Sequence, residues 1–483
     1  MNFISLTYAL FLGAVFLLYW RLPRRGQSLL ILIASYVFYS WWDYRFCALI
    51  FISSIIDFSV GLALGRKFER RTRRALLAIS LVANLGMLGF FKYFDFFREN
   101  LAQLGSAVGW HMDGVTLDII LPVGISFYTF QTMSYTIDVY RGHLKPTSAF
   151  VDYMAYVSFF PQLVAGPIER ATSLLPQFLS ERSFDLSEAR DGLRRILWGV
   201  AKKLILADNL AVIVELVYGN PGAYSETKLV FATVCFAFQI YCDFSAYSDI
   251  AIGTAQLFGI KLMRNFAYPY FSQSVAEFWR RWHISLSTWF RDYVFIPLGG
   301  SRGKRRTMIV SMLITFVISG LWHGASWNFV IWGAVNGLLI VPSALQKNPR
   351  RLTVKDVPGG ESYFPSVWVA LKIGLTFGFI CLGWVFFRAE TLQDAWSMVV
   401  RMLSFWSWTG GGETLNAGVS SRIMSMLLVV FVAVEWMQRR EVHALCRLER
   451  WPMWTRWLLY TLILWLAIAV QPVRVGDFIY FQF

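Results

Sequence analysis

Two histidines stand in apolar surroundings where a titratable ring needs an explanation. His323 lies in the stretch GLWHGASWNF (320–329), between two long apolar runs. A polar ring at membrane depth is costly and by default marks a functional position. A neutral imidazole can still accept a proton near neutral pH, because its unperturbed pKa is about 6.5. His323 is therefore a candidate general base, and hydrogen bonding between packed helices is the structural alternative.

His283 lies in a second unusual stretch, EFWRRWHISLSTWFRDY (277–293). At helical spacing Trp279, His283 and Ser287 stack on one face. The neighbouring face is an apolar, mostly aromatic stripe of Phe278, Trp282, Leu286 and Trp289. We expect an amphipathic helix at the cytoplasmic membrane interface. Taken alone, such a stretch is more typical of an ordinary membrane anchor of Trp and Arg than of an active site.

A third polar cluster lies in FQIYCDFSAYSDIAIG (238–253). Asp243 and Tyr247 share one helical stripe, and Asp249 lies on another. Carboxylates near the end of a membrane span must face a cavity or a partner. Asp243 and Tyr247 are therefore candidates for binding the substrate or the acyl donor. Ion pairing of the aspartates with the arginines of 277–293 is at least as good an explanation.

The composition indicates a helical membrane protein. Of the 483 residues, 56% are hydrophobic, and apolar runs of about 18 residues or more recur along the chain. The formal net charge of +15 lies in loops between these runs, as the positive-inside rule expects, so nucleic acid is not expected as a partner. The five cysteines have no paired spacing, so neither disulfides nor a zinc site is indicated.

The elements that must position these residues are about twelve membrane spans with both termini outside. Residues 149–167 are apolar but short, with basic residues on both sides, and we expect a re-entrant or interfacial segment there. The chain shows no internal repeat, so we expect one all-α polytopic domain over residues 1–483. The expected spans are at about residues 3–20, 27–42, 46–64, 74–94, 117–138, 196–218, 228–250, 307–322, 326–344, 366–388, 421–437 and 456–473.

Several common catalytic signatures are missing from the sequence. It contains no P-loop, no nucleotide-binding glycine fingerprint and no HExxH motif. His283, His323 and the two aspartates do not match any local ligand spacing, so we expect no metal site. The other histidines, His111, His143 and His443, lie in predicted loops and are most simply solvated.

Several blocks together resemble the membrane-bound O-acyltransferase (MBOAT) family, and within it the bacterial alginate O-acetyltransferase branch. The resemblance runs from about residue 5 to the C-terminus, and its blocks keep their order and spacing. They are FFPQLVAGPIER (159–170), YCDFSAYSDIAIG (241–253), EFWRRWHISLSTWFRDYVFIPLGG (277–300), GLWHGASWNF (320–329) and FIYFQF (478–483).

The resemblance implies an enzyme with its catalytic core at about residues 117–345 and a central tunnel. Its donor would be a cytoplasmic acyl thioester such as acetyl-CoA or a phosphopantetheine group, with no bound cofactor. The family's invariant histidine falls on His323, and a second, more variable position falls on His283. Many relatives have a histidine where this chain has Asn336, so that position cannot hold an essential base here.

The family's chemistry assigns further roles to the candidate residues. Arginines bind the phosphates of a thioester donor well, and a histidine inside a tunnel could serve as general base on the acceptor hydroxyl. Attack on a thioester builds an oxyanion, for which His283, Asn328 or backbone amides are candidate hydrogen-bond donors. The residues expected to meet the donor are Trp279, Arg280, Arg281 and Trp282.

The predicted topology creates a conflict that the fold must resolve. His283 is expected on the cytoplasmic side, whereas His323 falls nominally near the outer end of a span. Groups that act in one reaction must lie close together, so we expect the two histidines within about 15 Å of each other. Either the loop at His323 or the segment 251–300 must enter the helix bundle. A funnel from the cytoplasm should then meet His323 near mid-membrane.

The favoured function is O-acetylation of an exported polysaccharide, alginate-like or cellulose-like, from the bacterial inner membrane. A periplasmic acetyltransferase or other polysaccharide-modifying partner would complete the transfer, and an acyl carrier protein could deliver the donor. The alternatives are D-alanyl or other acyl transfer from a carrier protein to a cell-wall polymer, a lipid or small-molecule acceptor, and a non-enzymatic acyl or polymer conduit. An ion-coupled transporter would need two repeat halves, which the sequence lacks.

Overall fold

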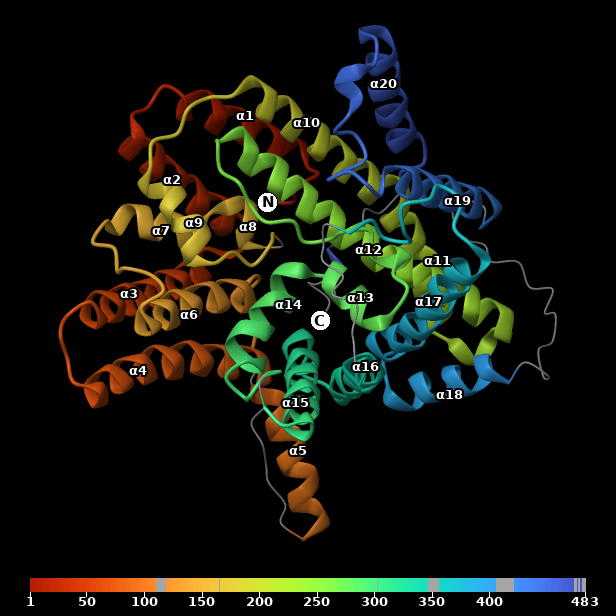
Figure 1. Ribbon diagram of the computed structural model, residues 1–483, viewed down its shortest axis with the longest axis horizontal. Coiled ribbons are helices and arrows are strands. Elements are labelled where there is room, and N and C mark those ends of the chain that lie inside the picture. The colour runs from red at the N-terminus through yellow and green to blue at the C-terminus, as the bar shows by residue number, and fades with distance from the viewer. Residues whose placement is uncertain are drawn as a thin grey trace. The chain divides into compact units, whose positions relative to one another are not determined.

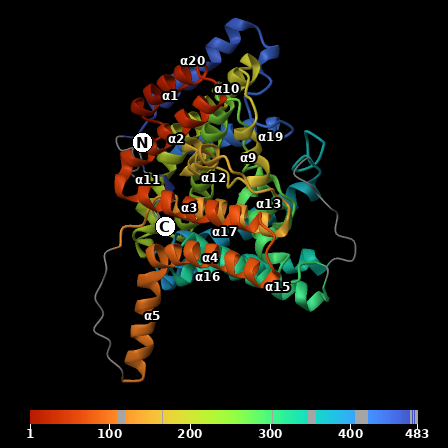
Figure 2. The same cartoon turned by 90° about the vertical axis from the view of Figure 1, so that its left-hand side faces the viewer.

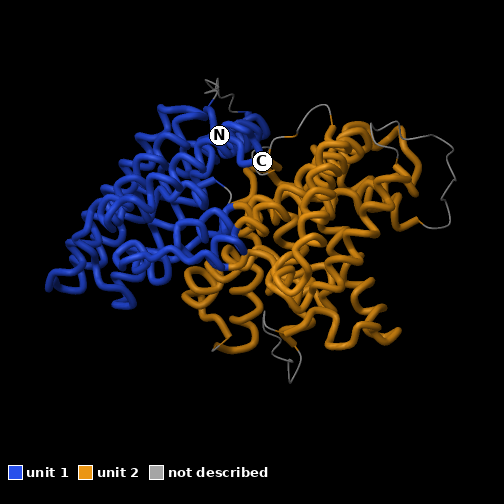
Figure 3. Tube along the Cα trace, turned by 90° about the horizontal axis from the view of Figure 1, so that it is seen from above, with its two compact units in different colours: residues 1–192, 251–263 blue, residues 193–250, 264–483 orange. Residues whose placement is uncertain are grey.

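Two compact units make up the chain in the computed structural model, which describes residues 1–109, 119–164, 166–301, 303–345, 356–404, 421–472, 476 and 478–479. Unit 1 comprises residues 1–192 and 251–263, and unit 2 comprises residues 193–250 and 264–483 (Figure 3). Helices α10 (Leu186–Ala201) and α12 (Glu226–Leu257) contribute residues to both. Every regular element in the described residues is a helix, which confirms the all-α fold class. One membrane domain over residues 1–483 stays a prediction.

The described residues include seven helical runs that are long and apolar enough to cross a membrane. This confirms a multi-pass membrane protein. One run, Arg24–Leu64, contains two of the predicted spans. Its first helix ends at Asp43, and the next begins at Cys47. The first and last predicted spans fall on shorter apolar helices. The total of about twelve crossings stays a prediction.

Unit 1 contains the N-terminal helices. In it α3 and α4 run side by side, and α6 packs against both (Figures 1 and 2). A buried carboxylate joins these three helices: Asp57 accepts hydrogen bonds from Ser80 (2.5 Å) and Asn84 (2.8 Å), and Ser80 bonds Thr136 (2.9 Å). The helices of this unit are α1 (Leu6–Tyr19), α2 (Arg24–Asp43), α3 (Cys47–Leu64), α4 (Arg70–Leu88), α5 (Phe94–Ala107), α6 (Ile125–Arg141), α7 (Phe150–Ser158), α8 (Phe160–Leu163) and α9 (Ala171–Leu179).

The segment expected to be re-entrant or interfacial is a broken helix. Its two pieces, α7 and α8, are separated by Phe159, whose ψ of 105° leaves the helical region. The carbonyl of Tyr156 near this break accepts hydrogen bonds from the side chains of Gln131 (2.7 Å) and Gln162 (3.0 Å). The carbonyl freed by the break therefore finds its hydrogen-bond donors inside the protein, as an apolar setting requires. Its position in the bilayer stays a prediction.

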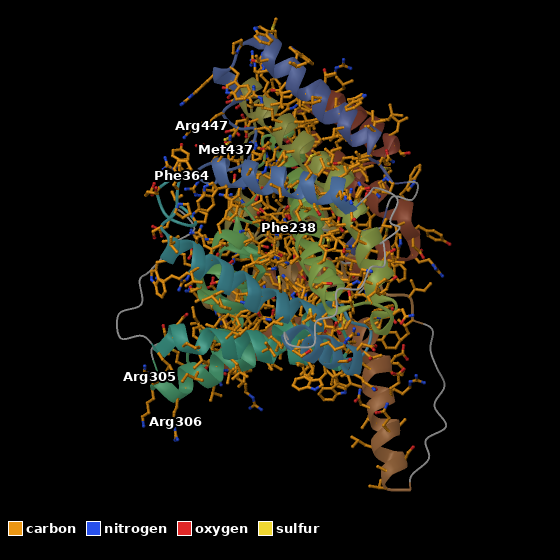
Figure 4. The ribbon with its side chains drawn as sticks, turned by 90° about the vertical axis from the view of Figure 1, so that its right-hand side faces the viewer. Phe238, Arg305, Arg306, Phe364, Met437 and Arg447 are labelled. Atoms are coloured by element: carbon orange, nitrogen blue, oxygen red, sulfur yellow. The ribbon has the colours of Figure 1, made fainter. Side chains whose placement is uncertain are left out.

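Unit 2 is built around an aromatic core. Phe238 of α12 lies among the helices in Figure 4 and contacts the rings of Tyr270 (5.3 Å), Phe377 (5.8 Å) and Phe431 (6.4 Å). These rings come from three further elements, so the core ties the unit together. Its other helices are α11 (Asp208–Tyr218), α13 (Val275–Arg281), α14 (Ile284–Phe290), α15 (Arg305–His323), α16 (Trp327–Leu345), α17 (Val367–Arg388), α18 (Leu392–Leu403), α19 (Ser421–Gln438) and α20 (Met453–Ala469).

The predicted hairpin around GLWHGASWNF is present as α15 and α16. The two helices pack extensively and approach each other closely at glycines. A Cβ atom at Gly320 would collide with the carbonyl of Phe329, and one at Gly333 would collide with the carbonyl of Phe316. Small residues permit this close backbone approach between membrane helices. Through it, the hairpin fixes His323 at the end of α15.

Candidate active site

The stretch 277–293 is not the single amphipathic helix that its periodicity predicts. It forms the short helices α13 and α14, broken at Trp282 and His283. Trp282 is extended, and His283 adopts a left-handed conformation with φ of 43°. The predicted stack of Trp279, His283 and Ser287 on one helical face is therefore wrong. A non-glycine residue in this conformation is strained, and such strain clusters at functional sites.

His283 is buried within unit 2 and not exposed at a surface. Its ring is 1% exposed and packs on Phe244 of α12, with ring centroids 4.6 Å apart. Its Nδ1 lies 3.1 Å from Oδ1 of Asn265. Burial lowers the pKa of His283 to about 3, so the ring is neutral at physiological pH. The expectation of an exposed amphipathic helix at this point is corrected, because tertiary packing buries the ring. The position of the segment relative to the membrane interface stays a prediction.

His323 is enclosed by aromatic rings at the end of α15. It is 3% exposed, and its ring lies 5.0 Å from Trp332 and 5.3 Å from Phe387. Trp322 is 4.9 Å from His323 and 6.0 Å from His283, measured between ring centroids. The two imidazoles are therefore separated by no more than the sum of these two distances, which is below the 15 Å limit expected for a shared site. The structure brings the two histidines together.

The contacts bear on the predicted topological conflict. The segment that carries His283 lies inside unit 2, between Phe244 of α12 and Trp322 of α15. Trp282, next to His283, is equally buried and contacts Phe266 (5.0 Å) and Trp384 (5.0 Å). The part of the 251–300 segment around His283 therefore lies among the helices of unit 2. The depth of each histidine in the membrane stays a prediction.

The residues expected to meet the donor differ in their exposure. Arg280 is exposed, whereas Arg281 is 1% exposed and forms an ion pair with Glu277 (2.9 Å). Only Arg280 of these two arginines is therefore open to a phosphate. Trp279 donates its indole N–H to Oδ1 of Asn336 (3.3 Å). Asn336 thus positions the indole ring of Trp279. Donor binding by Trp279, Arg280, Arg281 and Trp282 stays a prediction.

Asn328, a candidate oxyanion donor, is buried near the start of α16. It is 6% exposed, and its side-chain amide donates to the carbonyl of Ala389 (2.8 Å). Ala389 follows α17, so the bond fastens the end of that helix to α16. An amide group has two N–H donors, and this bond uses one of them. The oxyanion role of Asn328 stays a prediction.

The predicted arginine partners of the aspartates are wrong. Asp243 pairs with Lys203 (2.9 Å), and Asp249 pairs with Arg195 (2.8 Å) and Lys202 (2.7 Å). The spacing of Arg195 and Lys202 by seven residues places both on one helical face, and this signal could have identified them. The cations come from α10 and the residues after it, which are distant in sequence from 277–293.

Asp243 and Tyr247 contact the C-terminal segment. The Asp243 carboxylate accepts the backbone N–H of Ile479 (2.8 Å), and Lys203 donates to the carbonyl of Gly476 (3.1 Å). The ring of Tyr247 lies 4.3 Å from that of Phe478. These two predicted binding residues therefore hold Phe478 and Ile479 against α12, and direct contact with a donor or substrate stays a prediction.

Comparison with known proteins decides the family. The model of the membrane-bound O-acyltransferase family, MBOAT, matches residues 5–356. The chain belongs to the membrane-bound O-acyltransferase family. It is 39% identical over 444 residues to the Azotobacter vinelandii protein named Probable alginate O-acetylase AlgI, covering 92% of this chain and 85% of that relative.

Other relatives of this O-acyltransferase modify different polymers according to their names. The Helicobacter pylori Peptidoglycan O-acetyltransferase is 34% identical, over 81% of this chain and 78% of that protein. The Streptococcus thermophilus Teichoic acid D-alanyltransferase is 28% identical, over 57% of this chain and 69% of that protein. The family membership confirms an O-acyltransferase.

The remaining histidines of the acyltransferase behave differently from one another. His143 is exposed, as predicted, with 64% of its side chain accessible. His443 is 3% exposed, and its Nδ1 accepts the backbone N–H of Leu445 (3.3 Å), so the prediction of a solvated ring is wrong there. His111 lies outside the described residues. In the part of the chain that the structure describes, no cluster of three His, Cys, Asp or Glu side chains is arranged to hold a metal.

Proposed function

We propose that this acyltransferase moves an acetyl group from a cytoplasmic thioester donor across the bacterial inner membrane, for O-acetylation of an exported polysaccharide. The observation that carries the proposal is the pair of buried imidazoles that share Trp322. Two rings in one aromatic enclosure suit a reaction that must exclude water, because hydrolysis would waste the thioester. The names of relatives with 39% and 34% identity favour O-acetylation.

The proposed reaction requires one proton acceptor and one oxyanion donor. His323 removes the proton of the acceptor hydroxyl as its oxygen attacks the thioester carbonyl carbon. The carbonyl oxygen gains negative charge, the new C–O bond forms, and the C–S bond breaks. The proton returns to the departing thiolate. Exposed Arg280 contacts the phosphates of the donor, which is acetyl-CoA or a phosphopantetheine-bearing carrier protein. A periplasmic partner then passes the acetyl group from the acetylated acceptor to the polymer.

The test is polymer acetylation in cells that carry His323→Ala. Loss of a general base lowers the rate by about 10²–10⁴-fold, so ester-linked acetate on the polymer should fall to near the level of a deletion strain. His143→Ala is the matched control, because that ring is 64% exposed. Both variants must accumulate in the membrane to wild-type levels.

The identity of the released acid separates the proposal from D-alanyl transfer. Mild base releases the ester-linked group, and acetate is the expected product. D-alanine in its place would overturn the donor assignment while leaving acyl transfer intact. Full acetylation by a folded His323→Ala protein would overturn the role of His323.

A further inference from the structure

A short loop before α13 lies directly against the turn that carries His283. Ala267 donates its backbone N–H to the carbonyl of Arg281 (3.0 Å), and Ile284 donates to the carbonyl of Asn265 (2.9 Å). These two backbone bonds hold residues 265–267 opposite residues 281–284. They also explain how His283 can keep its left-handed conformation, because its neighbours on both sides are fixed.

The side chain of Asn265 has a defined orientation. One terminal atom faces the backbone N–H of Ser285 (3.3 Å) and its hydroxyl (2.9 Å), and the other faces the hydroxyl of Ser248 (3.2 Å). A backbone N–H can only donate, so the atom that faces it must be the amide oxygen, Oδ1. The hydrogen-bond partners therefore identify the oxygen of Asn265.

This oxygen determines which nitrogen of His283 carries a proton. Oδ1 of Asn265 lies 3.1 Å from Nδ1 of His283. Since an amide oxygen can only accept, Nδ1 must donate and therefore bears the hydrogen. In a neutral imidazole the other nitrogen, Nε2, then has a lone pair and can only accept. Burial lowers the pKa of His283 to about 3, which keeps the ring neutral.

We propose that Asn265 is a positioning residue, which holds His283 as its Nδ1–H tautomer so that Nε2 meets the reacting groups as a hydrogen-bond acceptor. The meaning of this tautomer for acyl transfer rests on the proposed function. A neutral ring in this state cannot donate to the thioester oxyanion. It pairs instead with a donor, and the acceptor molecule supplies one in a second hydroxyl, separate from the hydroxyl that His323 deprotonates. The oxyanion is then left to Asn328 or backbone amides.

The tautomer can be measured directly by ¹⁵N NMR of the full-length protein in membranes with labelled histidine. The chain has five histidines, and loss of one signal pair in His283→Gln identifies the relevant ring. We expect a protonated Nδ1 and an unprotonated Nε2 for His283. Asn265→Leu, which removes the acceptor, should shift the ring to the Nε2–H tautomer or to a mixture. Asn265→Asp keeps an acceptor oxygen and should retain Nδ1–H.

The possible results separate this inference from the proposed function, because no substrate is needed. An Nε2–H tautomer in the wild-type protein would overturn the positioning role of Asn265, and so would an unchanged Nδ1–H tautomer in Asn265→Leu. If Asn265→Leu does not accumulate, the wild-type and Asn265→Asp spectra still decide, since both must report Nδ1–H. Loss of polymer acetylation in His323→Ala together with an Nε2–H tautomer would support the proposed function and reject the role of Asn265.

Discussion

His283 shows how neighbouring side chains give a residue a role that its type alone leaves open. An imidazole can donate, accept or do both, and the contact with Asn265 selects one of these states. The surrounding rings add a second effect, because they exclude water and keep the group neutral. The aromatic residues of the site therefore act on the chemistry without carrying it out.

Lys203 is the residue whose loss should damage unit 2 most directly. Its ammonium is 1% exposed and pairs with Asp243 (2.9 Å) and Asp208 (2.8 Å). Lys203→Met would leave two buried carboxylates without their cation, and breaking such a pair costs about 3–5 kcal/mol. We expect a marked fall in the thermal unfolding midpoint of the detergent-solubilised protein. Lys304→Met, at an exposed position, should leave the midpoint unchanged, and an equal midpoint for both variants would contradict the prediction.

Glu169 should give unit 1 a pH-dependent stability. Burial raises the pKa of its carboxyl from 4.5 to about 7, even though it accepts the backbone N–H of Met263. Between these two pH values, Glu169 is still protonated in the folded protein but has lost its proton in the unfolded chain. The free energy of unfolding therefore falls as pH rises through this range. Thermal midpoints between pH 5 and 8 should show this fall in wild type and a smaller one in Glu169→Gln. Parallel curves for the two proteins would refute it.

The sequence predicts the residues of the site better than their surroundings. His323 could be identified because a histidine within a long apolar stretch is unusual, however the helices pack around it. Asn265 could not, because it reaches His283 from a loop, and no periodic pattern reports a contact made by tertiary folding. The prediction for His443 was wrong because its basic loop indicated a solvent-exposed ring, whereas tertiary packing buries it.

At the scale of helices, length and composition predict α15 and α16 well. Two apolar runs separated by a short polar stretch have few alternatives to a hairpin. The stretch 277–293 was mispredicted because its aromatic stripe fits a straight helix, whereas burial of Trp282 and His283 requires a turn between α13 and α14. Packing of large aromatic rings therefore outweighed local helical periodicity.

Gly333 tests whether the α15–α16 contact supports activity. A Cβ atom there would collide with the carbonyl of Phe316, so Gly333→Ala must push the helices apart at a cost of about 1–3 kcal/mol. We expect reduced acyl transfer by membranes that contain normal amounts of the protein, because the hairpin holds His323. Gly378→Ala in α17 is the matched control, since a Cβ there meets nothing within 4 Å. Equal activity of the two variants would show that the close approach is dispensable.

For the whole molecule, the charge pattern makes a prediction about sidedness. Lys67 and Lys304 lie in exposed basic loops of units 1 and 2, and the positive-inside rule places both in the cytoplasm. Cysteines introduced at these positions, one at a time, should react with a membrane-impermeant thiol reagent in inverted vesicles and not in intact spheroplasts. The five native cysteines are free and must first be replaced by serine. Labelling of either position in spheroplasts would refute the predicted topology.

The left-handed backbone of His283 has a genetic consequence. Asparagine and aspartate tolerate this conformation well, whereas proline and β-branched residues do not. A histidine codon becomes an asparagine or aspartate codon through one change of its first base. Alleles that lose the imidazole yet keep the turn therefore lie a single mutation away. A screen for cells that lose acyl transfer while still accumulating the protein should recover His283→Asn and His283→Asp repeatedly, and His283→Pro only among unstable variants.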